Sequence, residues 1–255
     1  MGQDCWICGA EADSAEHRLK KSDLVRAHGR GPYKGPSALS HVRGGKETSV
    51  QGPGSKTVKY LPSLCQHCNS KRTQPFDRAY DQFIDWIIKG NEGIVLHRRF
   101  IDFAEIYGND WESRQLDLYK YFAKSFGCRL IDAGTDVPKD VVELIGKERF
   151  RTALRLTVAV NEDVLLMPSK DRDGFIGKGD LLAWAPTQMP DEADGFTWDE
   201  HVSWLTICYW YNRFPDGRYG STWVADSQFL YLGSFAPLDD DTRADFVEKV
   251  ANRDE

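Results

Sequence analysis

The chain has 255 residues, a formal net charge of −6, 41% apolar residues and 28% charged residues. This composition is typical of one large or two small globular domains and excludes collagen-like and disordered classes. No run approaches the ~18 apolar residues that a membrane span needs, and the first residues lack the order of a secretory signal. We therefore expect a cytoplasmic protein with no membrane partner.

The charge is divided unevenly along the chain. Residues 1–100 carry 16 Lys and Arg against 10 Asp and Glu, a net charge of +6, whereas residues 101–255 carry −12. The segment from Arg18 to Arg72 is the most basic, with 12 basic and 2 acidic residues. This division indicates an anionic partner for the first part, such as nucleic acid. A solvated basic face is the alternative interpretation.

The first part is expected to fold as a cysteine knuckle, a loop-rich stretch and a helix. Residues 18–60 carry the glycine-, serine- and lysine-rich pattern of loops and hairpins, with one strand over residues 57–61. Apolar residues then recur every three or four positions, which predicts an amphipathic helix over residues 74–88. Pro75 suits the first turn of that helix, and Gly90 suits its end.

The second part is predicted to begin with helices and to end in an antiparallel sheet. Helical patterns cover residues 100–107, 111–126 and 137–150. Strand patterns cover residues 153–160, 164–167, 181–185, 202–211 and 221–232, and a final helix covers residues 241–250. The glycine-rich run 174–179 lacks the context of a phosphate loop and is expected to be a turn. The fold class is therefore α+β, with two domains over residues 1–90 and 91–255.

Four of the six cysteines form two C-x-x-C pairs, Cys5 with Cys8 and Cys65 with Cys68. Two such knuckles make a closed tetrahedral site of four thiolates, the ligand set of structural zinc. A disulfide framework is the alternative, and it fits poorly without a secretory signal. The remaining cysteines, Cys128 and Cys208, have the pattern of ordinary buried thiols.

Two further features lie beside the knuckles. Glu16 and His17 follow the first knuckle, and Asn69 comes directly after the second. The joint pattern C-x2-C…E-H…L-C-x2-C-N resembles the HNH endonuclease family, in its zinc-supported ββα-metal branch. The resemblance covers about residues 4–88. It implies a small zinc-knuckle ββα-metal module, followed here by a mixed helical and antiparallel-sheet domain.

The resemblance also implies roles for these residues. Glu16 and Asn69 would bind a catalytic Mg²⁺ or Mn²⁺, for which oxygen ligands are suited, and His17 would be the general base that activates water. The family's middle Asn, which orients the base, would lie near Tyr60 and is missing here, so a backbone carbonyl is one substitute. Taken singly, His17 also reads as a surface histidine and Asn69 as a helix cap.

The sequence therefore predicts a divalent-metal-dependent endonuclease that hydrolyses DNA, and RNA is the alternative substrate. A phage-defence or restriction-type role follows from the resemblance alone. The alternative is a non-catalytic, zinc-stabilised nucleic-acid-binding module with a protein-interaction domain. Eight basic residues are named for the nucleic-acid face, where phosphate contacts position a strand without reading its sequence: Lys20, Lys21, Arg26, Arg30, Arg43, Lys46, Lys71 and Arg72.

Two patterns have less specific interpretations. Asp77 and Asp81 lie one helical turn apart, so they either hydrogen-bond a histidine of the site or form a salt bridge with Arg78, and we favour the structural role. Six of the eight tryptophans lie beyond residue 100, which favours an aromatic sheet core. The alternatives are a stacking pocket for a base and a surface for self-association or a partner protein.

Overall fold

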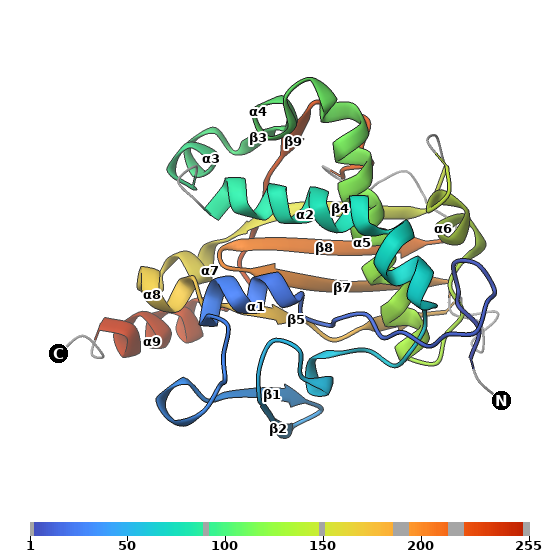
Figure 1. The fold of residues 1–255 in the computed structure, drawn as a ribbon. Helices are drawn as coiled ribbons and strands as arrows, with labels where there is room; N and C mark the ends of the chain where they lie inside the picture. The colour runs from blue at the N-terminus through green and yellow to red at the C-terminus, as the bar shows by residue number, and fades with distance from the viewer. Residues whose placement is uncertain (1–2, 89–91, 148–150, 186–193, 214–221, 252–255) are drawn as a thin grey trace.

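The computed structural model describes residues 3–88, 92–147, 151–185, 194–213 and 222–251. Its centre is a six-stranded sheet in the order β10-β4-β8-β7-β5, with β6 also paired to β7 (Figure 1). The strands are β4 (Leu154–Asn161), β5 (Ile176–Lys178), β6 (Leu182–Trp184), β7 (Gly195–Val202), β8 (Leu205–Asn212) and β10 (Gly233–Phe235). The pairs are antiparallel except β10 with β4, which is parallel.

Helix α5 (Trp111–Asp132) lies against one face of this sheet. Phe126 stacks on Trp198 of β7 with ring centroids 5.0 Å apart, and Phe122 meets the ring of Tyr209 in β8 edge-on at 6.1 Å. Helix α2 (Gln74–Trp86) packs on α5 in turn, through Tyr80 stacked on Tyr121 at 4.0 Å. Since α5 is covered from both sides, it is buried along most of its length.

The other elements surround this stack. The helices are α1 (Lys21–His28), α3 (Glu92–Arg98), α4 (Phe103–Tyr107), α6 (Lys139–Leu144), α7 (Glu162–Leu165), α8 (Ser169–Arg172) and α9 (Asp240–Ala251). Short helical turns are η1 (Gly35–Ser37), η2 (Lys56–Val58), η3 (Cys68–Arg72) and η5 (Gly108–Asp110). Strands β1 (Leu39–Arg43) and β2 (Lys46–Val50) form a separate hairpin, and β3 (Phe100–Asp102) pairs with β9 (Phe229–Tyr231).

The two knuckles are joined by a pair of extended segments. Residues 14–18 run antiparallel to residues 58–64, with isolated bridges from Ser14 to Leu64 and from His17 to Lys59. The Tyr60 N–H donates to the Glu16 carbonyl at 2.9 Å, within this pair. The second segment leads through η3 into α2. Two paired extended segments followed by a helix therefore frame the region between the cysteines.

The mixed helix-and-sheet fold is confirmed, and so are several predicted elements. The predictions over residues 74–88, 111–126, 153–160 and 241–250 correspond to α2, α5, β4 and α9. The strand predicted over residues 202–211 begins later, because Ser203 has a φ of +53° and turns the chain between β7 and β8. Strand β7 itself was not predicted, since its polar residues hide the pattern.

Five other predictions were wrong in detail. Residues 57–61 overlap η2, residues 164–167 overlap α7, the run 174–179 contains β5, and the loop prediction for residues 18–60 missed α1. The helix predicted over residues 100–107 begins only at Phe103, because residues 100–102 form β3. Helix α1 forms in a polar sequence because Leu24 is buried and its charged residues pair with α2. Gly90, residues 148–150 and residue 221, at the edges of three predicted elements, lie outside the described residues.

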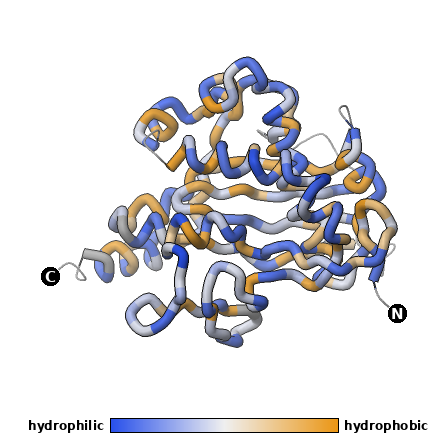
Figure 2. Tube along the Cα trace, viewed as in Figure 1, coloured by the Kyte–Doolittle hydropathy of each residue, from blue (hydrophilic) through white to orange (hydrophobic). Residues whose placement is uncertain are grey.

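One core cluster contains buried residues from both sides of residue 90. It includes Cys5, Cys65 and Cys68 of the knuckles, the apolar face of α2, the buried apolar residues of α5 and the inner face of the sheet. Figure 2 shows hydrophobic and hydrophilic residues interspersed along the helices. A second, smaller cluster of Leu24, Tyr33, Val50 and Val58 holds α1 to the hairpin. The division into residues 1–90 and 91–255 stays a prediction, and α2 shares its core with α5.

Among the helices of the described residues, none combines the length and the apolar character that crossing a bilayer requires.

Candidate functional site

The four paired cysteines come together at one point. The Sγ atoms of Cys5, Cys8, Cys65 and Cys68 all lie within 4.8 Å of one another, and those of Cys8 and Cys65 are 3.6 Å apart. Four sulfurs at this spacing fit the tetrahedral thiolate site of a structural zinc ion. The predicted metal-binding cluster is therefore confirmed as an arrangement of side chains that could hold a metal such as zinc.

The first knuckle docks on α5 through Trp6. The indole ring lies so close to Gly127 that a Cβ atom at that position would be 2.6 Å from the nearest ring atom. Only glycine leaves this space, so the close approach of knuckle and helix depends on the missing side chain at Gly127. The cysteine cluster is thereby fixed to the helix that also covers the sheet.

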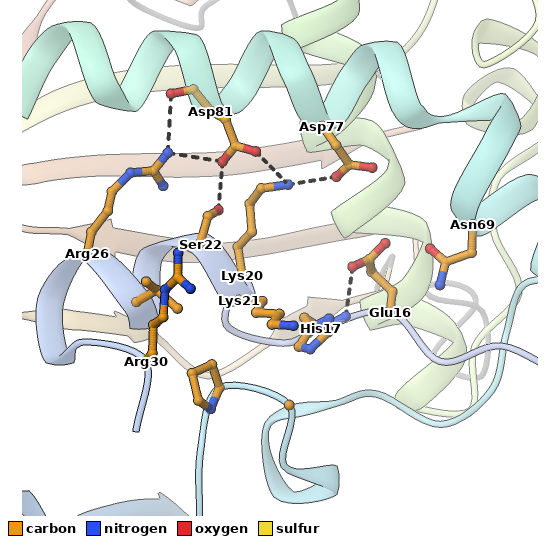
Figure 3. A pocket seen from close by; sticks show the side chains of 13 residues that line it. Glu16, His17, Lys20, Lys21, Ser22, Arg26, Arg30, Asn69, Asp77 and Asp81 are labelled. Carbon is orange, nitrogen blue, oxygen red and sulfur yellow. Dashed lines mark hydrogen bonds and ion pairs between the residues drawn. The ribbon is translucent and has the colours of Figure 1, made fainter. Parts of the chain in front are cut away.

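A cleft of about 900 Å³ lies between α1, α2 and the loop at Pro53 and Gly54 (Figure 3). It brings together Glu16 and His17, which precede the basic segment, and Asn69, which lies near the end of that segment. The remaining lining residues are Lys20, Lys21, Ser22, Val25, Arg26, Arg30, Asp77 and Asp81. The three residues predicted to form the site thus share one cavity.

Glu16 is held by two donors. Its Oε1 atom accepts a hydrogen bond from the His17 backbone N–H at 2.8 Å, and its Oε2 atom lies 2.6 Å from the Lys124 ammonium. Burial by itself would raise the pKa of Glu16, but the Lys124 charge and these hydrogen bonds outweigh it and lower the pKa to about 2. The carboxylate is ionised and fixed in orientation.

Lys124 is a member of the site that the sequence prediction missed. Its side chain is 1% exposed, and besides Glu16 its ammonium contacts both carboxylate oxygens of Asp77 at 3.2 and 3.3 Å and Thr73 Oγ1 at 3.4 Å. It comes from the middle of α5, within the apolar run Tyr121–Phe126. A lysine inside such a run is the signal that could have found it, because buried ammonium groups need anionic partners.

His17 is half-buried and neutral. Burial lowers its pKa, and Lys59, Lys21 and Lys20 lower it further, against the opposing charge of Glu16. The Nε2 atom is buried and has no hydrogen-bond partner among the described residues. The backbone carbonyl expected as a substitute for the missing middle Asn is therefore not found at this nitrogen.

Asn69 is fixed by the segment that carries Glu16. Its Nδ2 donates to Ser14 Oγ at 2.9 Å, and its backbone N–H donates to the Cys65 carbonyl at 3.0 Å. Its side-chain oxygen points across the cleft toward the Glu16 carboxylate (Figure 3). It lies within η3 and does not cap α2, whose N-cap position is Thr73. Two oxygen donors that face each other fit the ligand chemistry of Mg²⁺ or Mn²⁺.

Two of the predicted phosphate-binding cations have partners inside the molecule. Lys20 pairs with Asp77 at 2.8 Å. Arg26 pairs with Asp81 at 3.1 Å and also with Asp23 and Asp85. The acidic stripe on α2 therefore holds α1 in place, as Figure 3 shows for Asp77 and Asp81. This confirms the structural role expected for those two residues but corrects the partner, because Arg78 instead donates to Gln74.

The other predicted cations are distributed over three places. Lys21 and Arg30 are exposed in the cleft, with no ion-pair partner among the residues that the structure describes. Lys71 and Arg72 are exposed on η3. Lys46 is exposed on the hairpin. The backbone of Arg43 ends strand β1 of the same hairpin.

The tryptophans of the second part are divided between the core and the surface, and Trp111 is partly buried and packs against the core. Trp198, Trp204 and Trp223 are buried, whereas Trp184 and Trp210 are 37% and 39% exposed. The cleft described above contains none of them. No aromatic stacking platform therefore faces Glu16 and His17 among the lining residues.

Comparison with known proteins finds no match among protein-family models, curated proteins or solved structures. The geometry of the site is thus the basis for a functional interpretation.

Proposed function

We propose that this protein is a divalent-metal-dependent endonuclease of HNH-like type that hydrolyses phosphodiester bonds of DNA. The observation that carries the proposal is the cleft in which Glu16, His17 and Asn69 meet beside the four-cysteine cluster. The paired extended segments that lead into α2 add to it, because they match the ββα order that the resemblance implies.

The chemistry assigned to His17 follows from its charge state. A neutral imidazole has one nitrogen free to accept a proton, and its lowered pKa keeps it neutral at pH 7. His17 would accept the proton of the attacking water in the cleft. Glu16 and Asn69 would hold a Mg²⁺ or Mn²⁺ ion, which when bound stabilises negative charge on the phosphate and the leaving oxygen.

The exposed cations of the cleft fit an anionic substrate. Lys21 and Arg30 line the same cavity as His17 and carry charges that no described carboxylate neutralises by an ion pair. They would contact the phosphates on either side of the reacting bond. Phosphate contacts of this kind provide affinity without sequence preference. A phage-defence or restriction-type role is part of the proposal and follows from the resemblance only.

The test is cleavage of supercoiled plasmid by the full chain and its His17→Ala variant, with Mg²⁺, Mn²⁺ or EDTA. We expect metal-dependent nicking or linearisation by the wild type and none by the variant. Zinc content and melting temperature should be equal in the two proteins. His67→Ala is the matched control, because His67 lies exposed between zinc ligands and outside the cleft.

Equal cleavage by wild type and His17→Ala would show that His17 is not the base. No cleavage of plasmid or of a single-stranded RNA by either protein, together with salt-sensitive DNA binding, would favour the non-catalytic nucleic-acid-binding module. The observation that favours this second function is that His17 Nε2 has no hydrogen-bond partner in the described part of the chain.

A further inference from the structure

The Lys124 ammonium lies against the carboxylate that is proposed to hold the divalent ion. Its distance of 2.6 Å to Glu16 Oε2 is that of a direct ion pair. The lysine comes from α5, outside the segment that resembles a nuclease, and its side chain is 1% exposed. Its polar contacts to Glu16, Asp77 and Thr73 hold it at this position.

The charges of Glu16 and Asp77 are balanced by their direct ion-pair partners. Lys20 also lies 3.9 Å from Asp81, which pairs with Arg26 in turn. Glu16 and Asp77 supply two negative charges, and Lys124 and Lys20 supply two positive charges within 3.2 Å of them. Carboxylate clusters attract a divalent ion through their excess negative charge, and this cluster of four has none. A second cation placed on Glu16 would also lie close to the Lys124 ammonium and be repelled by it in a site of low dielectric constant.

A substrate phosphate would change this balance. The exposed Lys21 and Arg30 lie in the same cleft and attract an anionic backbone. The phosphate brings the excess negative charge that the cluster of Glu16, Asp77 and the two lysines lacks. It also brings additional oxygen ligands, which Mg²⁺ commonly takes from substrate phosphates. Metal and substrate would then bind with positive coupling.

We propose that Lys124 is a built-in competitor of the divalent ion, so that the site takes up metal only together with a phosphate group of the substrate. This inference rests on the proposed function. It makes Lys124 a positioning and gating residue, since its buried ammonium does not reach the substrate. It also means that a residue of the second part of the chain controls the site formed by the first.

The experiment measures Mn²⁺ binding to the full, zinc-loaded chain by the loss of the electron paramagnetic resonance signal of free Mn²⁺. In the absence of nucleic acid, we expect Lys124→Met to bind at least tenfold more tightly than the wild type. The double variant Lys124→Met/Glu16→Gln should lose that gain. Lys120→Met is the matched control, because Lys120 is a buried lysine one turn earlier on α5 whose ammonium lies over the Phe76 ring.

A second measurement uses the wild type alone and is independent of whether the variant folds. A short oligonucleotide with uncleavable phosphorothioate linkages should raise the Mn²⁺ affinity of the wild type at least tenfold, after subtraction of Mn²⁺ bound by the oligonucleotide itself. Equal affinity with and without the oligonucleotide, or unchanged or weaker binding by folded Lys124→Met, would overturn the inference.

These outcomes separate the inference from the proposed function. If the wild type cleaves DNA in a His17-dependent manner and Lys124→Met does not bind Mn²⁺ more tightly, the nuclease function is supported and the proposed competition between Lys124 and the metal ion is wrong. If Lys124→Met binds more tightly through Glu16 and no protein cleaves nucleic acid, the cation site stands and the nuclease function is wrong.

Discussion

Asn69 donates a hydrogen bond from Nδ2 to Ser14 Oγ at 2.9 Å. The contact ties the residue after the second knuckle to the segment that leads from the first knuckle to Glu16. It also directs the side-chain oxygen of Asn69 toward the Glu16 carboxylate (Figure 3). A serine that no sequence pattern singles out therefore helps to set the distance between two proposed metal ligands.

Ser14→Ala should impair metal-dependent cleavage while it lowers the free energy of unfolding only modestly. The loss of one hydrogen bond costs about 0.5–1.5 kcal/mol of unfolding free energy, while Asn69 becomes free to rotate its carbonyl away from the cleft. We expect the Mn²⁺ concentration for half-maximal plasmid cleavage to rise several-fold. Ser70→Ala is the control, because its hydroxyl donates to the Gln66 carbonyl on the exposed side of η3. Equal metal dependence in the two variants would contradict the role of Ser14.

The rate of cleavage should fall only at pH values below the ordinary pKa of histidine. Because burial and nearby lysines lower the pKa of His17, its imidazole accepts a proton at pH 7 and loses this ability as the pH falls through the lowered pKa, below about 6.5. Lys59→Met should raise the pKa of His17 and so move this fall in cleavage rate to higher pH. The pH profile of kcat/KM and the NMR titration of the His17 ring measure it. If the rate of Lys59→Met fell at the same pH as that of the wild type, the charge of Lys59 would not be a cause of the lowered pKa of His17.

Removing one thiolate should unfold the knuckle region. Cys65→Ser leaves three ligands, and structural zinc contributes folding free energy directly. Because Cys65 belongs to the same core cluster as α2 and α5, we expect the melting temperature of the whole chain to fall and zinc content to drop below one ion per chain. Cys128→Ser, at a buried cysteine outside the metal cluster, should keep its zinc. Full zinc content in Cys65→Ser would argue against the four-thiolate site.

Gly127→Ala should be destabilising although alanine favours helices. The added Cβ would meet the Trp6 ring at 2.6 Å, and overpacking of this kind costs about 1–3 kcal/mol against a helix-propensity gain of about 1 kcal/mol. The same substitution in a Trp6→Ala background should be neutral or stabilising. Denaturant unfolding of the four proteins gives the coupling energy. A coupling near zero would mean that the knuckle does not depend on this approach.

The Glu16 pair should make the protein sensitive to acid. The pKa of Glu16 is about 2 in the fold and about 4.3 when unfolded, so its ionised form stabilises the fold above pH 4.3. This contribution, about 3 kcal/mol, is lost as the pH falls toward 2. Glu16→Gln should therefore be less stable than the wild type at pH 7, and the two stabilities should converge near pH 2. Parallel curves over that range would be inconsistent with the ion pair to Lys124.

Several parts of the fold follow from local patterns that the sequence shows directly. The period of α2 places Phe76, Ala79, Tyr80, Phe83 and Ile84 on one buried face, and the C-x-x-C spacing needs only a tight turn to aim two thiolates at one point. These are interactions over a few residues, so composition and spacing are enough to predict them. Helix α1 and strand β5 were not predictable in this way, because their polar residues are ordered by partners elsewhere in the chain.

The sequence by itself determined the knuckles, the principal helices and the residues Glu16, His17 and Asn69 as candidates for one site. Only the tertiary structure decided that Lys124 of α5 pairs with Glu16, and that Lys20 and Arg26 are bound by the acidic stripe of α2 rather than free for phosphate. The reason is that an ion pair between distant segments depends on which helix faces cross. The packing of α2 on α5 through Tyr80 and Tyr121 brings Asp77 to Lys124, and the segment that carries Glu16 and Lys20 then pairs with charges of both helices.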